Sequence, residues 1–437
     1  MRNKILLSVL LFGASQLSAQ VSTNVYTIDY CIQQVLNNNF DVEASRYDAE
    51  IAKQSATKGN AGLLPNVSLS GGANYSNNNT ELIFAGGIPP TNVDGAQSTS
   101  YNGSVGVSYT VFNGFANLSN YDRLMLNEQL SVTQLRLTIE NAVITVIGLY
   151  LDLAKSQEDL NALNETLTIS RTRLKRAEVS SELGVSNSLS LLNATVDFNT
   201  DSVNVLSIKN QIGALKRQMN FLMGNDINND FNVETSIKSF NDLSLADILS
   251  QAKTNNVLSV LTTLGERVSE VDSRLAKANQ YPTVSVNTSY GLNSSRNGAG
   301  IVLEQNNIGF AGGLSISIPV FSGGRTKIAI ANAESQLAKS ETVKKQNDFL
   351  IEKEVFDYWN NYVYFQKALE LEQKNIQTAL LNERRSEDAF KLGQITSVEF
   401  RQAQLALLAS KNRVNAAKYN LKKAEYQLIR LKGDLVK

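Results

Sequence analysis

The sequence predicts a mainly α-helical chain that consists of two copies of one plan, each copy carrying a pair of β-strands. Three observations predict this fold class: two stretches of about 65 residues without proline, four short segments in which apolar and polar residues alternate, and motifs that recur in the same order. The chain has only 5 prolines in 437 residues. Because proline interrupts the hydrogen bonds of a helix interior, this scarcity favours unusually long helices.

The first residues, 1–19, predict a secretory signal peptide. Arg2 and Lys4 precede a short apolar run, 5–12, and we expect cleavage after Ala19. An uncleaved membrane anchor is the alternative, but the apolar run is too short to span a bilayer. After the signal peptide, no stretch of about eighteen consecutive apolar residues occurs, so no transmembrane helix is expected. The mature chain is therefore expected either to stay soluble outside the cytoplasm or to enter a membrane as a β-barrel.

Composition argues against several classes of function. Lysine plus arginine equals aspartate plus glutamate at 41 each, so net charge gives no reason to expect a nucleic-acid partner. The chain has no histidine and a single cysteine, Cys31, so the usual metal sites and an intramolecular disulfide are not expected. Cys31 is expected to be a small buried residue on a short helix. With no catalytic constellation either, the sequence predicts no enzyme, no cofactor and no metal.

The two copies are expected to be repeat 1, residues 20–239, and repeat 2, residues 240–437. Each repeat contains three motifs in the same order. The first is a segment with a proline at which a strand begins. The second is the sequence phenylalanine, small residue, glycine, at which the next strand ends, and the third is a glycine in a later turn. These motifs begin or lie at Leu64 and Tyr281, Phe112 and Phe321, and Gly184 and Gly393. Each repeat is therefore expected to run helix, strand, strand, very long helix, tight turn, long helix.

Four strands are expected at about 64–75, 101–112, 281–292 and 308–321. In each of them one face is apolar and the other is small and hydroxylated, which indicates a half-buried sheet. The apolar face fits membrane lipid as well as a protein core, and a soluble β-sandwich layer is the alternative. Four strands cannot close a barrel around a useful pore, so several chains would have to contribute.

Four long helices are expected at about 117–182, 187–223, 326–391 and 396–432. At 1.5 Å per residue, the longest give rods of roughly 100 Å. Apolar residues at alternating steps of three and four along both return helices, from Leu191 to Leu222 and from Phe400 to Leu428 and Leu431, predict a coiled-coil seam. The polar residues in this seam, Asp201 and Ser410, mark a register point, a wetter stretch of helix or a tolerated surface edge, and the pattern does not choose among the three.

The order of these motifs resembles the TolC family of outer-membrane efflux proteins over essentially the whole mature chain. The family's Leu-Leu-Pro before the first strand matches residues 63–65, and its phenylalanine, small residue and glycine match 112–114 and 321–323. The resemblance implies a homotrimer with a 12-stranded β-barrel in the outer-membrane lipid of a Gram-negative bacterium, continued by a periplasmic α-helical barrel. It implies an exit duct for efflux or type I secretion that works with a periplasmic adaptor protein and an inner-membrane transporter.

The turns between the long helices are the candidate site. In the family these turns dock the adaptor, and the matching residues of this chain are Arg176, Gly184, Ser188, Arg385, Gly393 and Ser397. A purely structural interpretation is equally open, because glycine can end a helix in a left-handed conformation and a following serine or threonine can cap the next helix.

The family also keeps a periplasmic gate at these turns, and this sequence departs from the best-known pattern. Glu399 matches an acidic residue of the constriction, but Gln402 replaces the second acid and Phe390 stands where a latching tyrosine is found. A threefold ring of Glu399 would favour cations. A solvated surface glutamate is the alternative.

A soluble periplasmic coiled-coil adaptor or scaffold is the remaining alternative for the whole chain, since it would share the signal peptide and the long hairpins. The four strands argue against it because neither face of them carries the charges of a water-exposed sheet. The sequence does not indicate the exported substrate.

Overall fold

A computed structural model describes residues 24–184, 188–236 and 243–436, so the expected signal peptide, 1–19, lies outside the described residues. The described residues fall into two compact units, which are treated separately below. The described parts of Met1–Gln34, Val146–Lys238 and Ile376–Ala416 form unit 1, and those of Val35–Thr145, Ser239–Asn375 and Ala417–Lys437 form unit 2. Both units draw on both predicted repeats, so the repeat boundaries stay a prediction about the sequence.

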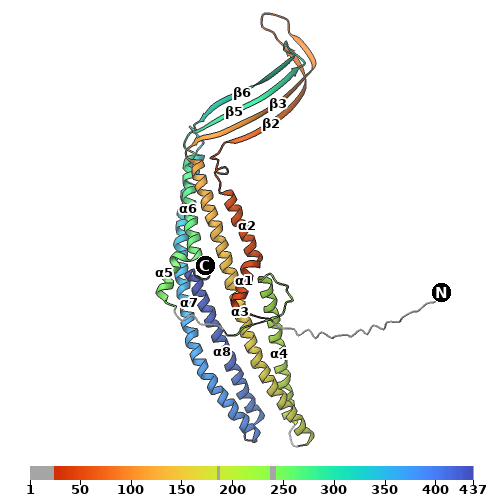
Figure 1. The fold of residues 1–437 in the computed structure, drawn as a ribbon, viewed down its shortest axis with the longest axis vertical. Helices are drawn as coiled ribbons and strands as arrows, with labels where there is room; N and C mark the ends of the chain where they lie inside the picture. Colours follow the sequence, from red (N-terminus) through yellow and green to blue (C-terminus); the bar gives the residue numbers. More distant parts are fainter. Residues whose placement is uncertain (1–23, 185–187, 237–242, 437) are drawn as a thin grey trace, which may run out of the picture. The chain divides into compact units, whose positions relative to one another are not determined.

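The long helices confirm the predicted fold class (Figure 1). Helices α3 (Ala116–Glu182) and α7 (Arg325–Lys391) each contain 67 residues, and each begins within one residue of its expected start. The return helices are α4 (Ser188–Leu222) and α8 (Ser397–Lys432). The order of helix, two strands, long helix and return helix therefore occurs twice.

One window of α3 is apolar enough to cross a membrane by length and composition, with a mean hydropathy of 1.5. This qualifies the expectation that no such segment follows the signal peptide. However, 44% of that window is buried inside the protein, including Tyr150, Leu151 and Leu153 at 2% exposure or less. A helix in the core of a protein can be equally apolar, so this window is weak evidence for a membrane-spanning helix.

Unit 2 contains a four-stranded antiparallel sheet in the order β2-β3-β5-β6. Its strands are β2 (Asn66–Leu82), β3 (Thr91–Asn113), β5 (Thr283–Asn297) and β6 (Glu304–Ser317). The first hairpin is longer than expected, because most of residues 76–82 and 91–100, which lie between the two expected strands, also pair across the hairpin. Asparagine and serine have low strand propensity, but the hydrogen-bonded ladder outweighs it.

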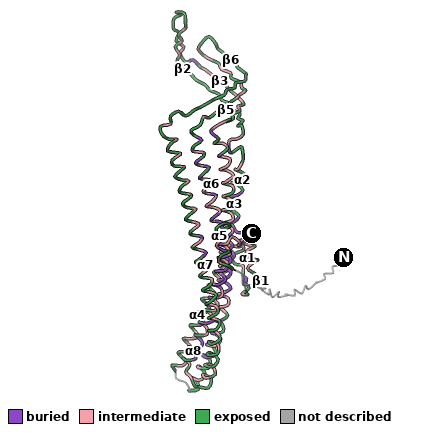
Figure 2. The backbone as a smooth tube through the Cα atoms, turned by 90° about the vertical axis from the view of Figure 1, so that its left-hand side faces the viewer, coloured by how far each residue is buried: buried purple, intermediate pink, exposed green. Residues whose placement is uncertain are grey.

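The sheet is exposed over most of its surface, as Figure 2 shows in green. Every residue of β6 is exposed, and apolar side chains such as Leu69 and Phe310 expose 83% and 73% of their surface. Within the described residues no second sheet covers these strands. A soluble β-sandwich would bury one face, so that alternative is wrong for this chain.

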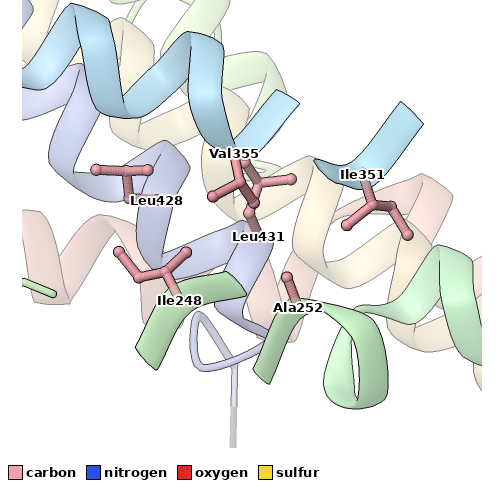
Figure 3. Close-up of a cluster of buried hydrophobic side chains, with 6 residues drawn as sticks. All are labelled: Ile248, Ala252, Ile351, Val355, Leu428 and Leu431. Carbon is pink, nitrogen blue, oxygen red and sulfur yellow. The ribbon is translucent and has the colours of Figure 1, made fainter. Parts of the chain in front are cut away.

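The shorter helices of unit 2 are α2 (Phe40–Ser55), α5 (Leu245–Asn255) and α6 (Val257–Ala278). A buried apolar cluster joins α5 to α7 and α8, and Figure 3 shows its members meeting from the three helices. The cluster consists of Ile248, Ala252, Ile351, Val355, Leu428 and Leu431. Leu428 and Leu431 belong to the predicted coiled-coil seam, which therefore packs as apolar core at this end of α8.

Unit 1 contains the part of α1 (Ile28–Asn38) that precedes Val35. It also contains two short parallel strands, β1 (Asn24–Tyr26) and β4 (Phe231–Val233), that the sequence did not predict. The hydroxyl of Tyr150 on α3 lies 3.0 Å from the carbonyl oxygens of both Tyr26 and Glu234. Cys31 is fully buried on α1, as expected, and burial raises the pKa of its thiol to about 12. A thiol with so high a pKa stays protonated and unreactive at neutral pH.

Candidate functional site: the tips of the helical hairpins

Both hairpin tips lie in unit 1, and both turn at a glycine. Gly184 has φ 67° and Gly393 has φ 73°, a left-handed conformation that glycine adopts without strain. At the second tip, the Gly393 N–H donates to the Phe390 carbonyl at 3.1 Å and the Gln394 N–H donates to the Ala389 carbonyl at 2.9 Å. This pair of bonds is a Schellman motif, which satisfies the last carbonyls of α7. The predicted helix-ending role of these glycines is confirmed.

Helix α8 begins with a reciprocal cap. The Thr396 N–H donates to the Glu399 carboxylate at 2.7 Å, and the Glu399 N–H donates to the Thr396 hydroxyl oxygen at 3.2 Å. The Thr396 hydroxyl also donates to the same carboxylate oxygen at 2.8 Å. These hydrogen bonds to its ionised form lower the pKa of Glu399. Glu399 is exposed, and it serves the helix start whatever else it does.

Phe390 and Gln402 differ in their surroundings. The Phe390 ring stacks on the ring of Phe400, with centroids 5.2 Å apart and planes 16° apart, and Phe400 is 2% exposed. Phe390 therefore closes the α7–α8 hairpin by packing. Gln402 is exposed and follows Glu399 by three residues, which places both side chains on one face of α8.

Below the tips, four charged side chains form what we call the hairpin charge cluster: Arg173, Asp197, Asp201 and Arg401. The Arg401 guanidinium donates to both carboxylate oxygens of Asp201, at 2.9 and 2.6 Å, and its Nε lies 3.6 Å from Asp197. Arg173 donates to Asp197 at 3.0 Å. The cluster has two positive and two negative charges, and it joins α3, α4 and α8.

Three of the four residues of the hairpin charge cluster are buried, and Asp197 is half-buried. Asp201 is 1% exposed, and Arg173 and Arg401 are 6% and 8% exposed. Burial lowers the pKa of Arg173, and the neighbouring Asp197 opposes that effect. Asp201 is thus no surface-edge position of the seam, and neither is Ser410, which is also 1% exposed. That interpretation of both residues is wrong.

The hairpin charge cluster could hardly be predicted from the sequence. Asp201 stood out as a charge in an apolar seam, and a buried charge requires a partner. Yet its partner Arg401 stands 200 residues away in sequence. In the register that aligns Gly184 with Gly393, Arg401 falls opposite Leu192 and Asp197 falls opposite Ala406. The cluster breaks the repeat symmetry, so comparison of the copies could not find it.

The predicted docking residues do not share one environment. Arg176, Arg385 and Ser188 are exposed, whereas Ser397 is half-buried. The Ser397 carbonyl accepts a hydrogen bond from Arg173 at 3.1 Å, and its hydroxyl accepts another from the same guanidinium. Ser397 is therefore tied to the hairpin charge cluster, while the two arginines point to solvent.

The model of the family described as "Outer membrane efflux protein" matches residues 31–225 and 263–434 of this chain. The chain belongs to the outer membrane efflux protein family. The resemblance inferred from the sequence motifs is thereby confirmed. This is a family of outer-membrane channels and not of enzymes.

Individual relatives agree with the family. The chain is 22% identical to outer membrane protein TolC of Escherichia coli strain K12 in an alignment that covers 95% of this chain and 83% of TolC. A solved membrane protein from Pseudomonas aeruginosa has the same fold with a TM-score of 0.81 at 15% identity, covering 95% and 93% of the two chains. The Campylobacter jejuni outer membrane channel CmeC matches with a TM-score of 0.80 at 14% identity, covering 94% and 86%.

The efflux family places this chain in the outer membrane, with its helices extending into the periplasm, which confirms the predicted location. A soluble periplasmic adaptor is therefore no longer an alternative. Nothing in the family match or the fold tests the docking and gate residues individually, so those assignments stay predictions.

The cap of α8 makes a prediction about pH. Because the folded pKa of Glu399 is lowered, its contribution to stability is present above the unfolded pKa and is lost as pH falls through the folded pKa. We expect the protection factors of amide hydrogen exchange at residues 397–400, which compare each rate with the intrinsic rate at the same pH, to fall over that acidic range. Thr396→Val should accelerate exchange at all pH values, with a loss of about 1 kcal/mol of local stability.

Glu399→Gln is the matched control for this pH dependence. Its protection factors at 397–400 should no longer change as pH falls, because the side-chain amide of the introduced glutamine does not titrate in that range. An acid-induced loss of protection that persists in Glu399→Gln would assign the effect to another group.

Proposed function

We propose that three copies of this chain close into one channel, with twelve strands in the outer membrane and a helical barrel in the periplasm. The channel would serve as the exit duct for efflux or type I secretion, together with a periplasmic adaptor protein and an inner-membrane transporter. The observation that carries the proposal is the open sheet. Its edge strands, β2 and β6, have no second strand partner among the described residues.

An open edge is not tolerated in lipid. Each unpaired backbone N–H or C=O group in the hydrocarbon costs several kcal/mol, so strands cross a membrane only as closed barrels. The chain offers four strands, and an edge strand of one copy can pair with the opposite edge of the next. Two copies would give an eight-stranded barrel, and side chains fill the interior of a barrel of that size. Three copies give the smallest closed barrel that keeps an open lumen.

Exposed apolar side chains along α7 support association of the helical part as well. Phe349, Tyr364 and Leu371 expose 76%, 64% and 51% of their surface. Large apolar side chains that face water on a long helix indicate a surface that another chain covers. Neighbouring copies in a helical barrel would cover them.

Electrophoresis tests the threefold assembly. Outer-membrane extracts in mild detergent should give a band at three times the mass of the chain, which heating converts to monomer. A chain that migrates as a monomer before heating, or that is recovered in the soluble periplasmic fraction, would contradict the proposed channel.

We also propose that the hairpin tips dock the adaptor, with Arg176, Gly184 and Ser188 on the first tip and Arg385, Gly393 and Ser397 on the second. The structural support is the exposure of Arg176 and Arg385 and of the turn glycines, Gly184 and Gly393. Ser397 would act through Arg173, which holds it, and not by direct contact.

A photo-crosslinking amino acid at Arg176 or Arg385 tests the docking proposal in cells. The expected product is one periplasmic protein linked at both positions. The control is the same probe at Lys209, an exposed residue of α4 that lies about 30 Å along the helix from Ser188. If both tip positions stay unlinked, or link no more than Lys209 does, the tips do not dock a periplasmic partner.

The gate proposal concerns Glu399, Gln402 and Phe390. Three copies of α8 would bring Glu399 and Gln402 into rings around the axis, and the Phe390–Phe400 stack would hold each hairpin in shape. A ring of carboxylates favours cations. We expect Glu399→Gln to lower the cation-to-anion permeability ratio of the channel in planar bilayers.

Thr396→Val separates this ring from the helix cap, because it disturbs the cap and keeps the carboxylate. Unchanged ion selectivity in Glu399→Gln would remove Glu399 from the constriction. An equal loss of selectivity in Thr396→Val would assign the effect to the fold of the tip.

A further inference from the structure

The two β-hairpins of this chain differ in a way that duplication does not explain. In the second hairpin the paired strands end at Arg296 and Glu304. In the first, β2 and β3 pair as far as Leu82 and Thr91, well beyond Ser98, where the pairing of β3 with β5 ends. Figure 1 shows this hairpin continuing past the ends of β5 and β6. One copy of the duplicated plan has thus acquired a projecting arm, which we call the β2–β3 arm, residues 77–97.

A β-bulge bends the β2–β3 arm. The register shifts between Asn78 and Thr80, so that Asn79 on one strand faces the extra residues Asp94 and Gly95 on the other. Gly95 has φ 67°, and its N–H donates to the Asn79 side-chain oxygen at 2.8 Å. A β-bulge bends and twists a hairpin locally. The bulge lies just past the last β3–β5 pair, so the arm changes direction where the four-stranded sheet ends.

The tip of the arm, residues 82–90, is apolar although it faces water. Ile83 and Ile88 expose 77% and 58% of their surface, and Phe84 beside them is half-buried. The tip has no charged residue, and the only charges of the arm, Glu81 and Asp94, lie below it. An exposed apolar tip indicates a surface that is covered in the assembly.

We propose that the tips of the β2–β3 arms from three copies contact one another over the outer mouth of the channel and narrow it. The inference rests on the proposed threefold closure. A twelve-stranded barrel with strands about 4.8 Å apart and tilted about 40° has a radius of about 12 Å. From the bulge to the turn, three strand residues and half of the loop reach at most about 20 Å. The arm is therefore long enough to reach the axis.

A second copy of this chain is the favoured partner because the tip is uncharged and symmetric assembly brings identical tips together. Identical charged tips would repel one another. An arm that bent outward would instead have to pass Glu81 and Asp94 through the headgroup layer before its tip met lipid. Contact with lipid is therefore an outcome that the experiment must separate.

Disulfide crosslinking of Ile83→Cys tests the contact. Three cysteines on one axis can form a single disulfide, so oxidation in intact outer membranes should convert about two thirds of the chains to covalent dimers. Ser76→Cys, on the barrel side of the bulge, is the control and should give no dimer. The natural Cys31 is fully buried and contributes none.

Measuring the heat-sensitive trimer in the same samples separates the two proposals. Loss of the trimer band would overturn the threefold channel. A normal trimer in which Ile83→Cys forms no disulfide, or in which a fluorophore attached to the introduced thiol is quenched by a lipid-borne quencher, would overturn the contact between arms alone.

Conductance gives an independent readout. Replacement of residues 81–92 by an Asn-Gly turn leaves the sheet below the bulge intact, and the shortened chain should still form the trimer. If the arms narrow the mouth, its single-channel conductance in planar bilayers should exceed that of the natural chain. Equal conductance of the two channels would contradict the narrowing.

Discussion

Asp201→Ala is expected to lower the free energy of unfolding by about 3–5 kcal/mol, because it removes the carboxylate that accepts both hydrogen bonds of the buried Arg401 guanidinium. Only the more distant carboxylate of Asp197, 3.6 Å from the Arg401 Nε, remains. Arg401 makes two hydrogen bonds to Asp201, at 2.9 and 2.6 Å, and both residues are less than a tenth exposed. Water cannot replace the lost partner without opening the contact between α4 and α8. Denaturant titration of the purified protein, followed by helical circular dichroism, measures the loss.

The double variant Asp201→Leu, Arg401→Leu is the matched control. It removes both charges and fills the space with apolar side chains, a change that is often neutral or stabilising for a buried pair. We expect most of the stability lost in Asp201→Ala to be absent from the double variant. A double variant as unstable as Asp201→Ala would show that the packing of α4 against α8 depends on the ion pair itself.

Breaking the hairpin charge cluster should also alter the periplasmic end of the proposed channel. Arg173 holds the first turn of α8 through the Ser397 carbonyl, and Asp197 contacts both arginines. Without Asp201, the two arginines share the single carboxylate of Asp197. The excess positive charge should weaken the contact between Arg173 and the first turn of α8. We expect Asp201→Ala to make cells that carry it more permeable to large solutes, while the double leucine variant should stay near the natural level.

Most of the fold was predictable from the sequence because local patterns of residues determine it. The long stretches without proline, the spacing of apolar residues along the return helices, strand-period alternation and the duplicated glycine motifs were sufficient to place the long helices and the four strands. The length of the first hairpin was not predictable. Residues such as Asn77 and Asn78 favour loops by propensity, and only their pairing with Gln97 and Ala96 keeps them in a strand.

The candidate site was predictable only in part, for a physical reason. Gly393 and the Thr396–Glu399 cap are local, so a few neighbouring residues determine them. The hairpin charge cluster depends on side chains that meet through tertiary packing of α3, α4 and α8, and no single stretch of sequence records that. The exposed Arg176 and the engaged Ser397 looked equivalent in the sequence for the same reason.

Gly114→Ala is the second substitution with a large expected effect. Gly114 ends β3 before α3 begins, with φ 67°, and a Cβ there would lie 2.7 Å from the Ala278 carbonyl oxygen and 2.7 Å from the Cβ of Tyr281. The left-handed conformation costs alanine about 1–2 kcal/mol, and relief of the clash costs about 1–3 kcal/mol more. We expect a loss of about 2–5 kcal/mol in total and a reduced yield of heat-sensitive trimer.

Gly323→Ala is the control that the duplication supplies, since Gly323 follows Phe321 and Ser322 as Gly114 follows Phe112 and Asn113. Gly323 has φ 61° as well, but a Cβ there would meet nothing within 4 Å. Its substitution should therefore cost only the backbone strain, about 1–2 kcal/mol. The difference between the two variants then isolates the close approach of the β3–α3 turn to the end of α6. Equal losses would mean that this approach relaxes freely, and that the two turns are equivalent in energy as they are in sequence.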